Sequence, residues 1–164
     1  MKREFGKYVS LNIFGMLGLS CYILADTFFV SAKMGADGLT ALNLAISIYS
    51  FINGTGLMIG IGGGTKYSVY RSRREEEKGN RVFTAALAMG FLIGIILFAV
   101  GIFAARPLSI LLGAEGKIIE MTTVYLRTIL CFSPCFICNN IFLAFVRNDG
   151  NPRLSMIGML VGSF

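Results

Sequence analysis

The sequence predicts an all-α membrane protein whose helices cross the bilayer several times. Apolar residues make up 55% of the 164 amino acids, and the mean hydropathy of +0.71 exceeds what a soluble domain of this length requires. Four charge-poor stretches follow one another, each longer than the ~20 residues that span a bilayer. We therefore expect transmembrane helices over residues 8–33, 37–70, 78–105 and 116–147, and a fifth over 152–164 that the end of the chain truncates.

Glycines shape the first two expected helices. The first is expected to end before Gly35, because a lysine in the last turn followed by glycine is typical of a helix C-terminus. The second has glycines four residues apart at Gly56, Gly60 and Gly64. Small residues at this spacing allow another helix backbone to approach closely. Flexibility is the competing interpretation, and we expect close packing with some local unwinding.

Charge and proline delimit the third and fourth helices. Three glutamates at 75–77 favour a helix N-terminus through the helix dipole, and the third helix is apolar nearly all round, as in a lipid-facing span. The Arg-Pro pair at 106–107 is expected to break it before a short interfacial turn at 108–112. In the fourth helix, Pro134 is expected to cause a kink and to free the carbonyl of Leu130.

Basic residues are unevenly divided between the two sides of the expected membrane. The net charge is +6, and eleven of the fifteen Lys and Arg residues lie at the N-terminus, between the second and third helices, or after the fourth. Three lie on the other side, and Arg127 lies within a span. The positive-inside rule therefore predicts a multi-pass protein of the cell membrane with a cytoplasmic N-terminus. The lipid bilayer is a sufficient partner for these charges, and nucleic acid is excluded because no aromatic-basic platform accompanies them.

Several other protein classes are also excluded. The N-terminus resembles a signal peptide, but its apolar run is too long and further spans follow. All four cysteines, at 21, 131, 135 and 138, lie in expected spans, and the chain contains no histidine. We therefore expect no metal site and no cofactor, with the cysteines serving as small apolar packing. No histidine cluster or pair of acids is placed to face water, so the chain is not expected to be an enzyme.

A single carboxylate, Asp26, lies inside the otherwise uncharged stretch 8–32. An acid at that depth costs on the order of 3 kcal/mol or more. Such residues persist where they face a wet cavity or a partner inside the protein, so Asp26 is interpreted as the proton or ion site of a transporter. The alternative is an acid near the helix end that snorkels to the interface or forms a structural pair.

The order and spacing of several short motifs resemble the multidrug and toxic compound extrusion (MATE) family along essentially the whole chain. The resemblance implies a twelve-helix, cation-coupled antiporter that exports drugs and organic cations, with two six-helix lobes around a cavity. This chain matches helices 1 to 4 and the start of helix 5 of the N-terminal lobe. The motifs are ADTFFV at 25–30, GADGLTAL at 35–42, LLGA at 111–114, YLR at 125–127 and RNDGNP at 147–152.

The resemblance places the family's helix-1 coupling carboxylate on Asp26 and implies that it binds H⁺ or Na⁺. Burial favours its neutral, protonated form. Amide oxygens and a freed carbonyl would be suitable ligands for Na⁺. The remaining candidates are Asn43, Asn139 and Asn140 as hydrogen-bond partners of Asp26, and Phe29, Tyr49 and Met58 as adaptable surface for the drug.

The chain lacks the family's C-terminal lobe, which the full mechanism needs as a partner. We therefore expect no transport by this chain alone, because alternating access requires two lobes that move against each other. The alternative function is a non-transporting membrane fragment that needs a partner or is degraded. The chain does not distinguish H⁺ from Na⁺ as the coupling ion.

Overall fold

Four helices make up most of the computed structural model, which describes residues 2–149, 154–155 and 157–158. For residues 2–12, 14–15, 19, 22 and 26 it describes the backbone alone. The predicted fifth helix, 152–164, falls mostly outside the described residues. The helices are α1 (Lys2–Ser72), α2 (Glu76–Leu111), α3 (Lys117–Cys131) and α4 (Ser133–Asn148).

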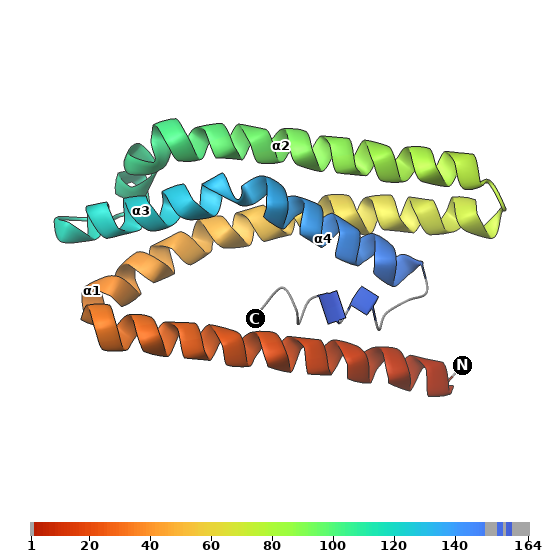
Figure 1. Ribbon diagram of the computed structural model, residues 1–164, viewed down its shortest axis with the longest axis horizontal. Coiled ribbons are helices and arrows are strands. Elements are labelled where there is room, and N and C mark those ends of the chain that lie inside the picture. Colours follow the sequence, from red (N-terminus) through yellow and green to blue (C-terminus); the bar gives the residue numbers. More distant parts are fainter. Residues whose placement is uncertain (1, 150–153, 156, 159–164) are drawn as a thin grey trace.

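Helix α1 consists of two helical segments that meet at Gly35. This glycine has φ 66° and ψ −154°, a conformation essentially restricted to glycine. Figure 1 shows that the chain reverses direction there, so residues 2–34 and 36–72 run in opposite directions. The helix end expected before Gly35 is therefore present. The local unwinding expected in the glycine-rich part is not, because residues 36–72 are helical throughout.

Two expected helix boundaries are wrong. Helix α2 begins at Glu76, as the acidic run indicates, but it continues through Pro107 to Leu111 instead of breaking at 106–107. Its last turns bend towards α3 (Figure 1). The single helix expected over 116–147 is two helices, α3 and α4, which meet at Phe132 with a bend of 50°. Pro134 lies in the first turn of α4, so the kink expected from this proline is confirmed as the bend just before it.

Glycine faces bring α1, α2 and α4 close together. A Cβ atom at Gly60 would lie 2.9 Å from the Cβ of Ala144, so only glycine lets α4 approach there. The close packing expected on this face is therefore confirmed. Helix α2, expected to face lipid all round, also has a glycine face. A Cβ at Gly94 would lie 2.5 Å from the Cα of Pro134, and one at Gly101 would lie 2.5 Å from the Cβ of Leu130.

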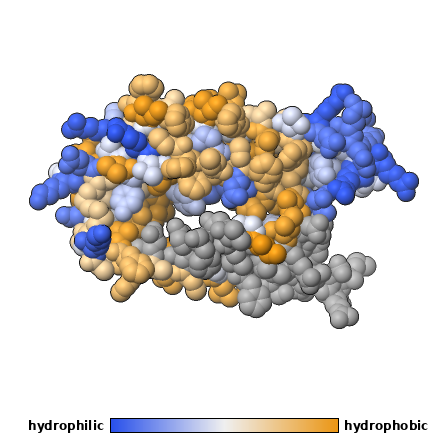
Figure 2. Space-filling model, in the orientation of Figure 1, coloured by the Kyte–Doolittle hydropathy of each residue, from blue (hydrophilic) through white to orange (hydrophobic). Residues whose placement is uncertain are grey.

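An apolar belt separates two hydrophilic ends (Figure 2). Helices α1 and α2 are each long and apolar enough to cross a bilayer, and the bent pair α3 and α4 is together long and apolar enough for one crossing. The predicted fold class, an all-α polytopic membrane protein, is confirmed.

Polar contacts tie α1 to α4 at the end that carries the α1–α2 turn. Arg71 forms an ion pair with Asp149 and donates a hydrogen bond to the Tyr67 hydroxyl at 3.0 Å. The Ser68 hydroxyl donates to the backbone carbonyl of Asn148 at 3.2 Å. These groups hold together the ends of two helices that are distant in sequence.

Candidate functional site

The predicted coupling residue, Asp26, lies nine residues before the turn at Gly35, in the first segment of α1. Its side chain is outside the described part of the chain, so its role and its expected contacts with asparagines stay predictions. Its backbone is helical. Backbone N–H groups inside a helix are already paired within it, so those around position 26 are not free to stabilise a negative charge.

Of the three predicted asparagines, Asn140 is the one that forms a hydrogen bond to another helix among the described residues. Its Nδ2 donates to Oδ1 of Asn53 at 2.7 Å, joining α4 to α1. Asn43 on α1 and Asn139 on α4 are both exposed. No hydrogen bond links Asn43 to Asn139 or Asn140 within the described residues.

Asn53 is the residue that sequence reasoning missed. In the sequence it stands out only as part of an Asn-Gly-Thr sequon inside an expected span, where glycan transfer is implausible. The signal that could have identified Asn53 is its position on the helix relative to the glycines. Asn53 is three residues before Gly56, on the side of the helix where small residues let a neighbour approach. A polar side chain beside such a contact is well placed to hydrogen-bond across it.

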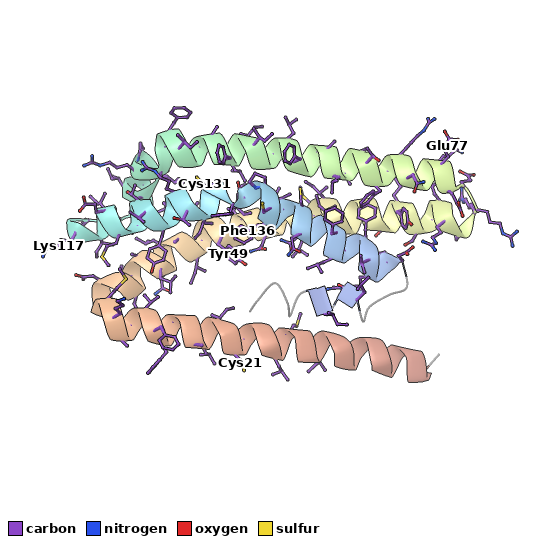
Figure 3. All side chains as sticks on the ribbon, viewed as in Figure 1. Cys21, Tyr49, Glu77, Lys117, Cys131 and Phe136 are labelled. Carbon is purple, nitrogen blue, oxygen red and sulfur yellow. The ribbon has the colours of Figure 1, made fainter. Side chains whose placement is uncertain are left out.

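Phe29, Tyr49 and Met58 do not line a common cavity among the described residues. Phe29 is 69% exposed and stacks edge-on with Phe28, with ring centroids 5.9 Å apart. Met58 is 71% exposed, and Tyr49 packs edge-on against Phe136 at 5.5 Å. Figure 3 shows Tyr49 and Phe136 side by side where α1 meets α4. Their predicted role as drug-contacting surface stays a prediction.

The carbonyl that Pro134 was expected to free is not free. The Ser133 hydroxyl is 2.6 Å from the carbonyl oxygen of Leu130 and 3.1 Å from that of Gly94. Ser133 is fully buried, so its hydroxyl supplies a donor at the bend where the proline cannot. The carbonyl of Leu130 is therefore not available as an ion ligand in this arrangement.

The described part of the chain encloses cavities between its helices, two of which lie near the candidate residues or the helix ends. One, of about 330 Å³, is at the end that carries the Arg71–Asp149 pair and is walled by aromatic rings including Phe83, Phe142 and Phe145. The other, of about 530 Å³, is beside the α1 turn, between α1 and α3. The residues that line it are mainly apolar, and Glu120 is the acid among them. The residues are Met34, Glu120, Met121, Val124, Tyr125, Thr128 and Ile129.

Comparison with known proteins yields a consistent set of similarities. A family model described as MatE matches residues 12–164. The Multidrug export protein MepA of Staphylococcus saprophyticus is 31% identical over 139 residues, which are 85% of this chain and 31% of that protein. MepA of Staphylococcus aureus strain MRSA252 is 27% identical over the same length. The chain thus spans about a third of the length of these curated relatives.

Solved transporter structures share the same arrangement. A MOP superfamily transporter from Pyrococcus furiosus, whose report describes a binding pocket of reversed polarity, superposes with a TM-score of 0.86 at 25% identity. A second structure, the outward-facing conformation of a multidrug resistance MATE family transporter, gives the same values. Each match covers 95% of this chain and 35% of the other chain.

Proposed function

The chain belongs to the MatE family, and from this premise we propose that it forms the first helices of a cation-coupled exporter of drugs or organic cations. The family match over residues 12–164 carries this proposal, and the MepA relatives, named as multidrug export proteins, support it. The rest of the proposed exporter, including its second lobe, corresponds to the part of the relatives' sequences that this chain does not match.

The exchange of cation and drug rests on Asp26. A carboxylate in a membrane span is stable when it is neutral or paired with a cation. In one state of the exporter Asp26 binds a proton or Na⁺. In the other state an organic cation competes with that ion. Asn43, Asn139 and Asn140 are the candidate amides that assist Asp26. In the proposed orientation the N-terminus is cytoplasmic, because the basic loops lie on that side.

The cavity beside the α1 turn has the chemistry to accept an organic cation. Its volume of about 530 Å³ is in the range of drug-sized sites. Methionine and tyrosine side chains such as Met121 and Tyr125 adapt to varied shapes, and Glu120 adds a negative charge. Phe29, Tyr49 and Met58 extend the apolar surface on α1.

The test is drug efflux by the full-length gene product in a bacterial host that lacks its own exporters. Asp26→Asn should abolish ethidium efflux, because the amide keeps the shape of the side chain but cannot bind and release a proton. Asp37→Asn is the matched control, since Asp37 is an exposed acid just beyond the α1 turn, and it should leave efflux unchanged. Proteoliposomes with an imposed pH or Na⁺ gradient then identify the coupling ion. Efflux that persists in Asp26→Asn would contradict the proposal.

The second candidate is a membrane protein that does not transport. The same proteoliposomes distinguish it, because such a protein would insert normally and show no gradient-driven movement of ethidium.

A further inference from the structure

The amide pair Asn53–Asn140 is a polar side-chain contact between α1 and α4. The two residues are 87 positions apart in the sequence and their hydrogen bond is 2.7 Å long. Both side chains are half-buried. Because hydrocarbon offers no alternative partners, such side chains are placed where a neighbouring helix can satisfy them.

Two backbone carbonyls determine the orientation of both amides. Nδ2 of Asn53 donates to the carbonyl of Tyr49 at 3.1 Å, and Nδ2 of Asn140 donates to that of Phe136 at 3.0 Å. A carbonyl only accepts hydrogen bonds, so each contact identifies the nitrogen end of its amide. Oδ1 of Asn53 is then the acceptor for the second N–H of Asn140. Both donors of Asn140 are used, and no described residue donates to its Oδ1.

The surrounding packing holds this pair in one geometry. A Cβ at Gly56 would lie 2.9 Å from the Cβ of Asn140 and 3.2 Å from the Cα of Ile137, so the two helices are close to backbone contact at this point. One turn away, the rings of Tyr49 and Phe136 meet edge-on at 89° (Figure 3). With little room to turn, the amide of Asn140 presents a fixed oxygen.

We propose that Asn53 is a positioning residue of the coupling-ion site. It holds Asn140 so that the Oδ1 atom of Asn140, to which no described residue donates, serves as an oxygen ligand for the coupling cation. An amide oxygen is a hard ligand suited to Na⁺, and it equally accepts a hydrogen bond from a protonated carboxyl group. The inference rests on the proposed function, because it requires that a cation is bound in this lobe. It adds Asn53 to the coupling-ion residues that the sequence predicts, which are Asp26, Asn43, Asn139 and Asn140.

The experiment is ethidium transport by the full-length gene product in proteoliposomes, measured as a function of the concentration of the coupling ion. Asn53→Leu keeps the branched shape of the side chain, although Leu is larger, and removes the acceptor for Asn140. Residues that orient a ligand typically change cation affinity about 10- to 100-fold. The ion concentration at half-maximal rate should therefore rise by about that factor, while the rate at saturating ion is kept. A purely structural contact would lower the amount of folded protein or the maximal rate without moving the half-saturation point.

Two further variants make the test specific. In an Asn140→Leu background, Asn53→Leu should cause no additional shift, because Asn53 acts through Asn140. Thr55→Val is the matched control, since the Thr55 hydroxyl bonds only within its own helix, to the carbonyl of Phe51 at 2.8 Å. It should leave half-saturation unchanged.

The outcomes separate this inference from the proposed function. Transport that survives Asp26→Asn, or no gradient-driven transport by the unmodified protein, overturns both. If Asp26→Asn is inactive but Asn53→Leu leaves half-saturation unmoved, only the positioning role is overturned. An additional shift in the Asn140→Leu background likewise overturns it.

Discussion

At the scale of single residues, the contact between α2 and α4 depends on the absence of a side chain at Gly94. A methyl group there would lie 2.5 Å from the Cα of Pro134 and 3.1 Å from its nitrogen. These are backbone atoms of a proline, which cannot move aside as a flexible side chain can. Gly94 therefore sets how closely the two helices pack.

We predict that Gly94→Ala destabilises the protein by about 1–3 kcal/mol, the usual cost of overpacking. Gly62→Ala is the control, because Gly62 is also within a helix and a Cβ there would meet nothing within 4 Å. It should be neutral or stabilising by about 0.5–1 kcal/mol. Thermal unfolding of both purified variants in detergent measures the difference. Equal midpoints for the two variants would show that α2 moves aside freely.

At the scale of elements, the reversal of α1 depends on one backbone conformation. Gly35 has φ 66° and ψ −154°, and a Cβ atom at this position would meet nothing within 4 Å. If a side chain at position 35 destabilises the protein, the cause is therefore strain in the backbone and not a clash with neighbouring atoms. The bend between α3 and α4 has a different origin, since Pro134 removes a donor and Ser133 replaces it.

Gly35→Ala should therefore cost about 1–3 kcal/mol through strain alone. Gly54→Ala, on the same helix and equally without neighbours around its Cβ position, should not be destabilising. Limited proteolysis and thermal unfolding in detergent are suitable measurements, because a strained turn opens before the rest of the protein unfolds. A Gly35→Ala protein as stable as Gly54→Ala would mean that the turn adopts another conformation at little cost.

At the scale of the whole molecule, the two hydrophilic ends lie on opposite sides of the apolar belt (Figure 2). Ser72 is the last residue of α1, and Glu115 lies between α2 and α3, at the other end of α2. Both are exposed. They are therefore suitable reporters of the two sides of the membrane.

We predict that the end carrying Ser72 is cytoplasmic, because most basic residues gather there. In a cysteine-free background, an impermeant thiol reagent added to intact cells should label Glu115→Cys and spare Ser72→Cys. Permeabilised cells should label both, which controls for accessibility. Labelling of position 72 from outside would reverse the proposed topology.

The all-α membrane class of the protein was readable from the sequence alone. Hydropathy and the distribution of Lys and Arg act locally and are imposed by the bilayer, so both are readable without knowing which helix packs on which. The turn at Gly35 and the start of α2 at Glu76 were readable for the same reason, since helix ends depend on nearby residues. The close approach at Gly60 was also foreseeable, because small residues four apart leave a groove on one face.

Which helix faces meet depends on tertiary packing, and the candidate site depends on those faces. Asn53 and Asn140 are 87 positions apart, so their pairing does not follow from local pattern. The contact of the Ser133 hydroxyl with the carbonyl of Gly94, 39 positions away, likewise depends on how α2 packs against the bend. Local sequence determines where a helix enters the membrane, whereas the rotation of each helix about its axis is determined by packing against helices that are distant in the chain.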